Sequence, residues 1–107
     1  DRGIDKKVLL IVWGEFGRTP RVNKTGGRDH WGSLMSILMS GGGLNVGQVI
    51  GSSTKTGDVP ANRPVSPTDV LATMYRHLGI DTTQHTVTNA GRPIPILSDG
   101  KPIRELI

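Results

Sequence analysis

The sequence predicts an α/β fold, and two buried strands and one helix carry this prediction. Residues 8–13 (VLLIVW) are continuously apolar and rich in branched side chains, as in a strand inside a parallel sheet. Residues 34–39 (LMSILM) form a second apolar run shortly before three consecutive glycines. Residues 67–78 have the period and the end signals of an amphipathic helix. Strands and a helix in one short chain are typical of a sheet with helices packed against it.

The first strand indicates where a functional site is expected. In an open α/β sheet, ligands usually bind outside the carboxyl ends of the strands. The segment after residues 8–13 is GEFGRTPRVNKTGGRDHWG, residues 14–32. We therefore expect this segment at the functional rim of the sheet. Further along the chain, residues 47–53 (GQVIGSS) predict only a short strand.

Local signals agree on a helix over residues 67–78. Ser66 is suited to the N-cap and Pro67 to the first helical position, and the Asp69 carboxylate can accept from free backbone donors of the first turn. Gly79 can close the helix in the left-handed conformation. The apolar stripe expected to face the sheet consists of Val70, Leu71, Met74 and Leu78, with Tyr75 beside it.

The rest of the chain predicts little regular structure. Extended segments around residues 94–97, broken by AGRP and SDGKP, predict one or two strands and then a tail that lies along the surface. The 107 residues include 15 glycines and 7 prolines, and only 35% are hydrophobic. We therefore expect a single domain with a modest core.

Composition excludes several chemistries. The chain has no cysteine, so disulfides and thiolate metal sites are excluded. Its longest apolar run is too short to cross a bilayer and its start has no signal-peptide pattern, so we expect no membrane. The net charge of +4 favours an anionic small molecule or polymer as partner. Scattered basic residues and an aromatic content of 4% disfavour nucleic acid.

Residues 14–32 contain the candidate metal ligands Glu15, Asp29 and His30. Carboxylates and imidazoles are the ligands that Zn²⁺ takes where no thiolate is present, and Ca²⁺ takes carboxylates. A catalytic metal also keeps one position open for water or substrate. The alternative is structural: Asp29 caps a turn, and His30 packs beside Trp31.

Arginines in the same segment are candidates for substrate binding. A guanidinium group binds a tetrahedral oxyanion such as phosphate or sulfate through paired hydrogen bonds. Arg18 is favoured because a glycine and a proline-containing turn flank it, and Arg28 is the second candidate. Arg21 raises the same question, and the alternative for each is an ordinary surface arginine. His77 and His85 are expected to be structural or solvated.

Four motifs in order cover nearly the whole chain: VLLIVWGEFGRTPRVNKTGGRDHWG, GGGLNVGQVIGSS, PVSPTDVLATMYRHLGID and GRPIPILSDGKPIREL. They resemble the closing part of the bacterial family named domain of unknown function 1501. That family is grouped with the alkaline-phosphatase and sulfatase-like superfamily of metal-dependent hydrolases. The resemblance implies a mixed sheet with flanking helices and the hydrolysis of phosphate or sulfate esters.

The resemblance also implies roles for single residues. Superfamily members place an acidic and histidine ligand motif after a buried strand, and WGEFG stands there, with Glu15 where aspartate is usual and Phe16 where histidine is usual. Their later ligand histidine is matched by His30, with Asp29 beside it. Phenylalanine cannot bind a metal, so a complete two-metal site of the usual kind is not expected. No catalytic nucleophile is assigned, because superfamily members carry it upstream.

Family members are typically several hundred residues long and often begin with a twin-arginine export signal. The chain therefore resembles a partial domain, residues 1–107, from the C-terminal end of a larger protein exported to the periplasm or cell surface. A sheet cut through its middle would leave the strand of residues 8–13 without a neighbour on one side. We therefore expect a homo-oligomer formed through that unpaired edge. Two functions stay open: a hydrolase fragment, weakly active or inactive alone, and a non-catalytic binding or assembly module that lost part of the metal site.

Overall fold

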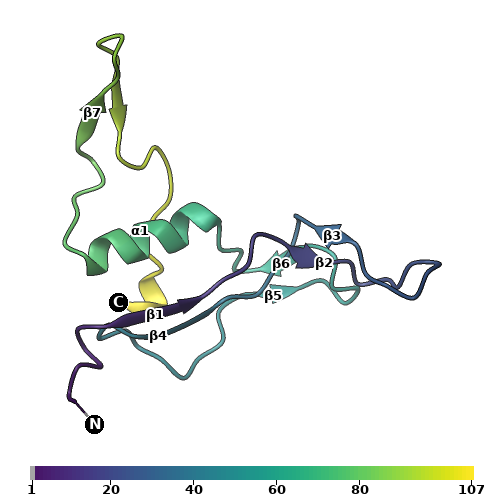
Figure 1. Cartoon of the computed structure of the whole chain (residues 1–107). Coiled ribbons are helices and arrows are strands. Elements are labelled where there is room, and N and C mark those ends of the chain that lie inside the picture. Colours follow the sequence, from purple (N-terminus) through teal and green to yellow (C-terminus); the bar gives the residue numbers. More distant parts are fainter. Residues whose placement is uncertain (1) are drawn as a thin grey trace.

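Figure 1 shows the computed structural model, which describes residues 2–107. Within residues 2–107, one α-helix and one short 3-10 helix lie among four two-stranded antiparallel sheets, and turns and loops connect them. The fold is therefore mixed α/β, as the sequence predicts. Within the described residues, however, no strands pair in parallel and no sheet has more than two strands.

The first predicted strand forms, but its surroundings differ from the prediction. Strand β1 (Leu9–Val12) pairs antiparallel with β4 (Leu38–Gly41), which begins and ends later than the predicted 34–39. Ile11 lies opposite Met39, and Met39 packs against the core. Cross-strand partners share a face, so alternate residues of β1 point away from the core. Leu10 is accordingly 54% exposed, and the prediction of a strand buried on both faces in a parallel sheet is wrong.

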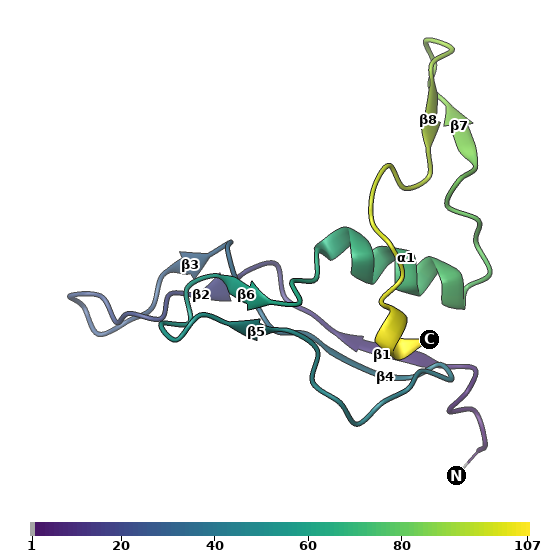
Figure 2. The same ribbon diagram turned by 180° about the vertical axis from the view of Figure 1, so that it is seen from behind.

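Three hairpins extend away from the β1–β4 pair. Strands β2 (Gly17–Arg18) and β3 (His30–Trp31) form the first, and β5 (Ser52–Ser53) and β6 (Pro60–Asn62) form the second. Figure 2 shows these two hairpins side by side beyond one end of the helix. Of the predicted strand 47–53, only the last two residues are in β5. The third hairpin, β7 (His85–Val87) with β8 (Pro93–Pro95), projects separately and includes part of the predicted extended segment 94–97.

The predicted helix is confirmed as α1 (Pro67–His77). The Ser66 hydroxyl accepts from the Asp69 backbone N–H at 3.1 Å, and the Asp69 carboxylate accepts from the Ser66 N–H at 2.9 Å. This capping box satisfies donors that the first turn would otherwise leave free. Gly79 has a φ of +71°, so the helix ends in the left-handed conformation that glycine adopts without strain.

The buried face of α1 is rotated from the predicted stripe. The buried residues of the helix are Val70, Ala72 and Thr73, whereas Leu78 is 60% exposed. The cause is the C-terminal tail. The sequence predicts that this tail lies along the surface, but its residues Ile103 and Leu106 are buried. The Thr73 hydroxyl accepts from the Ile103 backbone N–H at 2.9 Å and donates to the Asp69 carbonyl oxygen at 2.8 Å.

The core lies where the tail meets the helix and β4. It consists of Val70, Ile103 and Leu106, with Ile37, Met39, Leu44, Ile50 and Val65 packed against them. The short 3-10 helix η1 (Arg104–Leu106) ends the chain and carries Glu105, whose carboxylate accepts from the Arg63 guanidinium at 2.6 and 2.7 Å. These bonds lower the pKa of Glu105 to about 2.

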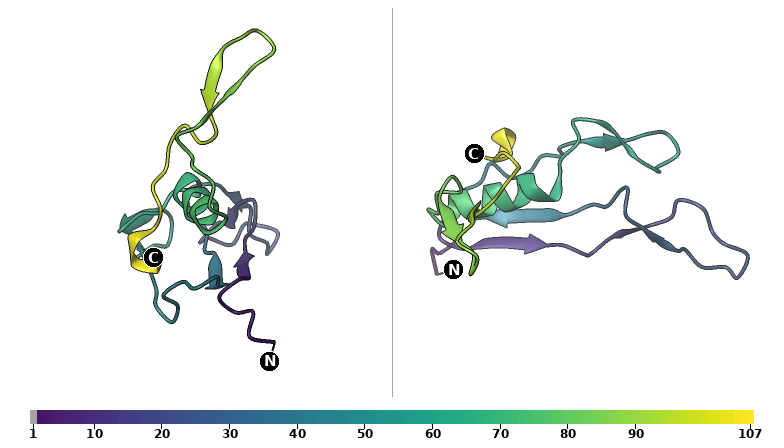
Figure 3. Two further views of the ribbon diagram at one scale, coloured as in Figure 1. Left: turned by 90° about the vertical axis from the view of Figure 1, so that its left-hand side faces the viewer. Right: turned by 90° about the horizontal axis from the view of Figure 1, so that it is seen from above.

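The molecule is open rather than compact. Its radius of gyration is 17.1 Å, against about 13 Å for a compact domain of this length. Its accessible surface is 8255 Å², against roughly 5,800 Å² for a compact monomer of its mass. Figure 3 shows the cause from two sides, since the hairpins reach well beyond the helix. Among residues 2–107, no helix has the length and apolar character needed to cross a bilayer.

Candidate functional site

Residues 14–32 fold into the β2–β3 hairpin and its connecting loop. Gly17 pairs with Trp31, and Arg18 pairs with His30. Gly17 is required here, because a Cβ atom at this position would collide with the carbonyl oxygen of Leu34. The two ends of the predicted site segment are thereby brought together by backbone pairing.

The Arg18–His30 pair forms a cluster with Phe16. The rings of Phe16 and His30 are stacked, with centroids 3.8 Å apart and planes inclined by 25°. The guanidinium carbon of Arg18 lies 5.6 Å from the centroid of the Phe16 ring, within the range of a cation–π contact. Stacking occupies one face of the imidazole, whereas hydrogen bonds and metals use its in-plane nitrogens. The cluster therefore fixes the ring of His30, which is itself exposed.

Both candidate substrate-binding arginines also brace the hairpin. Arg28 donates through Nη1 to the carbonyl oxygens of Thr19 and Pro20 at 2.7 and 2.6 Å. Arg18 donates through Nη1 to the carbonyl oxygen of Arg28 at 3.2 Å. Each arginine is exposed and has further guanidinium donors, so their binding of an anionic substrate stays a prediction.

The loop between β2 and β3 is organised by Asn23, which sequence reasoning did not single out. Its amide nitrogen donates to the Asp29 carboxylate at 3.0 Å, and its amide oxygen accepts from the backbone N–H groups of Thr25 and Gly27 at 3.0 and 2.9 Å. An asparagine shortly before two glycines is a turn signal, because its side chain bonds the backbone of the residues that follow. Asp29 is therefore held within the loop.

The three predicted metal ligands do not assemble into one site. In the described part of the chain, no three or more histidine and carboxylate groups lie close enough together to hold a metal ion. Asp29 and His30 are neighbours in sequence, and Asp29 accepts from Asn23 while His30 stacks on Phe16. Glu15 precedes this hairpin and is exposed.

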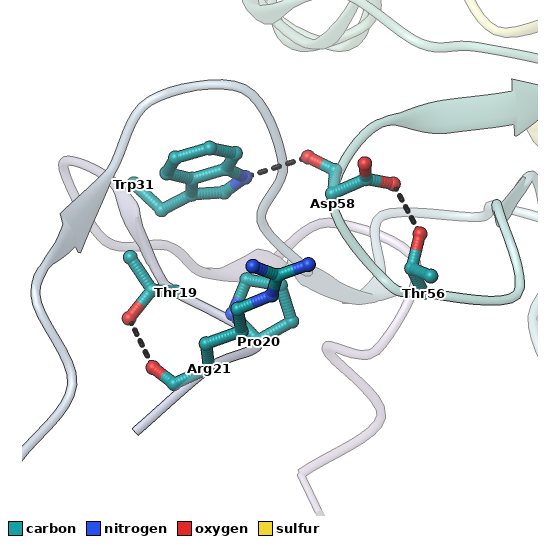
Figure 4. Close-up of a pocket in the computed structure, with 6 residues that line it drawn as sticks. All are labelled: Thr19, Pro20, Arg21, Trp31, Thr56 and Asp58. Atoms are coloured by element: carbon teal, nitrogen blue, oxygen red, sulfur yellow. Dashed lines mark hydrogen bonds between the residues drawn. The ribbon is translucent and has the colours of Figure 1, made fainter. Parts of the chain in front are cut away.

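A pocket lies between the β2–β3 hairpin and the β5–β6 turn (Figure 4). It is lined by Thr19, Pro20, Arg21, Trp31, Thr56 and Asp58. Trp31 donates its indole N–H to the carbonyl oxygen of Asp58 at 2.6 Å. The pKa of Asp58 is lowered by hydrogen bonds from the hydroxyls of Thr54 and Thr56, so its carboxylate is stabilised in the charged form. The sequence indicated Arg21 as a possible oxyanion-binding residue, but it did not indicate the β5–β6 turn that contains Thr56 and Asp58.

The protein is of the mixed α/β class. Its basic, glycine-rich β2–β3 hairpin lies between β1 and β4 in the chain. The family model described as Protein of unknown function (DUF1501) matches residues 1–107, and the chain belongs to this family. Neither the curated proteins nor the solved structures gave a significant match.

Proposed function

We propose that the chain supplies the basic side of a phosphate- or sulfate-ester hydrolase of the alkaline-phosphatase and sulfatase-like kind. By itself it is weakly active or inactive. The observation that supports this proposal is the pairing of Arg18 with His30 across the β2–β3 hairpin. Opposite residues of an antiparallel pair project from the same face, so a guanidinium and an imidazole are presented together.

This pair suits an ester of a tetrahedral oxyanion. The exposed Arg18 has guanidinium donors beyond the one bonded to Arg28 and can bind two oxygens of a sulfate or phosphate group. His30 beside it can donate a hydrogen bond to the ester or transfer a proton. Arg28 adds a second positive charge in the same hairpin, and the chain carries a net charge of +4.

A divalent metal does not fit the residues of this chain alone. Zn²⁺ at a catalytic site takes three protein ligands, and Ca²⁺ takes six to eight oxygens. The predicted ligands Glu15, Asp29 and His30 form no such group within residues 2–107. Phe16, which cannot ligate, stacks directly on His30. The roles proposed for Arg18 and His30 are therefore anion binding and proton transfer.

The test combines binding and turnover. NMR titration of the full chain with inorganic sulfate and phosphate should shift the His30 ring signals, and Arg18→Gln should weaken this binding about tenfold. Hydrolysis of a chromogenic sulfate or phosphate ester should fall to background in His30→Ala but not in His85→Ala, whose histidine lies on the distant β7 strand. Anion binding that is equally strong in Arg18→Gln, together with absent turnover, would rule the proposal out.

A non-catalytic assembly module is the second candidate, and a different observation favours it. The accessible surface exceeds that of a compact monomer by more than the roughly 800 Å² that each partner buries in a standard interface. Among the described residues, β1 has one partner strand, and Leu10 and Val12 on it are more than half exposed. Tight self-association or capture of an anionic polymer, without turnover of either ester, would favour this function.

A further inference from the structure

The pocket beside Trp31 is built from segments that are distant in sequence. Trp31 lies on β3, and the turn that contains Thr56 and Asp58 joins β5 to β6. The indole N–H of Trp31 bonds the Asp58 carbonyl oxygen at 2.6 Å. A Cβ atom at Gly57 would lie 3.8 Å from the Cβ of Pro20, so the turn packs against the hairpin. These contacts fix the two walls relative to each other.

The walls combine an apolar ring surface with hydroxyl groups. The polar atom of the Trp31 side chain is already bonded to the turn, so the rest of the indole offers apolar surface together with Pro20. Thr19, Thr56 and Asp58 line the same pocket, and the Thr56 hydroxyl donates to the Asp58 carboxylate at 2.9 Å. Figure 4 shows Trp31 on one side and Thr56 with Asp58 on the other.

Arg21 supplies a positive charge at this pocket. Within residues 2–107, its guanidinium is found in no hydrogen bond or ion pair, whereas Arg18, Arg28 and Arg63 donate to protein acceptors. Its backbone is fixed, because its carbonyl oxygen accepts from the Thr19 hydroxyl at 2.8 Å. A ring platform, hydroxyl partners and a positive charge that is not used by the fold therefore lie together.

We propose that this pocket binds one sugar unit of a saccharide that carries a sulfate or phosphate ester. The Trp31 indole packs against the apolar face of the sugar ring, Arg21 binds the anionic group, and Thr56 and Asp58 bond sugar hydroxyls. Neighbouring residues of a strand point to opposite faces, so Trp31 and His30 lie on different faces of the hairpin. The pocket is thus a second site, and its substrate class rests on the proposed hydrolase function.

The test follows the indole N–H signal of Trp31 by NMR in the full chain. The probes are a monosulfated disaccharide, its unsulfated form and inorganic sulfate. We expect the sulfated disaccharide to bind tightest, and Arg21→Gln to weaken its binding about tenfold. Arg92→Gln, which removes the same charge from the exposed turn between β7 and β8, should leave it unchanged.

Several results would overturn the pocket proposal. One is equal binding of the unsulfated disaccharide, and another is equal binding of inorganic sulfate. A third is an equal loss in Arg92→Gln and Arg21→Gln, which would show that only net charge matters. The His30 ring signals, followed on the same samples, separate the two proposals. A Trp31 shift with the sulfated disaccharide, but no Arg18-dependent His30 shift with inorganic sulfate, supports the pocket and contradicts the hydrolase. An Arg18-dependent His30 shift without disaccharide binding contradicts the pocket alone.

Discussion

Thr73 connects the helix to the C-terminal tail, and replacing it tests how the tail is held. Its side chain is 1% exposed, and its hydroxyl accepts from the Ile103 backbone N–H while donating to the Asp69 carbonyl oxygen. Thr73→Val keeps the shape of the side chain but removes the acceptor. Thr73→Ser keeps the hydroxyl and removes one methyl group.

The structure gives different costs for the two variants. In Thr73→Val the buried N–H of Ile103 loses its acceptor, and an unsatisfied buried donor costs about 1–3 kcal/mol. The Asp69 carbonyl oxygen loses less, because the helix backbone also donates to it. Removing one buried methyl in Thr73→Ser costs about 1 kcal/mol. We therefore expect a loss of about 2 kcal/mol for the valine variant, roughly twice that of the serine variant.

Urea and thermal unfolding followed by circular dichroism measure these costs. For a chain of this length, about 1 kcal/mol corresponds to roughly 4 °C in Tm, so Thr73→Val should melt about 8 °C lower than the wild type. Amide exchange at Ile103 should be faster in the valine variant and little changed in the serine variant. A valine variant as stable as the wild type, or a serine variant less stable than the valine one, would refute the role of this hydrogen bond.

Three further predictions concern charge, backbone and assembly. The bonds from Arg63 hold the pKa of Glu105 at about 2, below its usual 4.5, so this pair stabilises the fold above about pH 4.5 and is lost as the pH falls towards 2. Glu105→Gln should lower the urea midpoint at pH 7 and have no effect near pH 2; an equal effect at both would contradict this. Gly17→Ala should abolish the β2–β3 amide protection, whereas Gly32→Ala, with open space around its Cβ, should preserve it; equal protection in both would refute the close approach. The unpaired edge and the exposed apolar face of β1 predict concentration-dependent self-association in sedimentation experiments, which Leu10→Lys on that face should weaken; a folded wild type that stays monomeric would contradict it.

The helix could be predicted because all of its signals are local. The capping residues Ser66 and Asp69 and the closing Gly79 lie within the segment they control, and the structure confirms each of them. The face that α1 buries was not predictable in the same way. It depends on Ile103, which lies 30 residues from Thr73 in sequence and contacts it only after the chain has folded.

The candidate site was predictable in composition but not in geometry. Sequence placed Arg18 and His30 in one segment, and the hairpin pairs them. The stack of Phe16 on His30 was missed, since an aromatic residue in a loop carries no signal for its partner. The Trp31 pocket was also missed, because its second wall comes from a turn that includes Asp58, 27 residues away.

The error at β1 has a physical reason that bears on function. A continuously apolar strand indicates that both of its faces are covered, and the pattern cannot say which molecule covers them. In this chain the core residues of α1 and the tail pack against Met39 of the partner strand β4, while Leu10 and Val12 of β1 are more than half exposed. Val8 is 52% exposed beside them, so the apolar surface is continuous along the strand. The apolar pattern of this strand therefore predicts a second layer against the exposed face of β1, and this is the surface that self-association would cover.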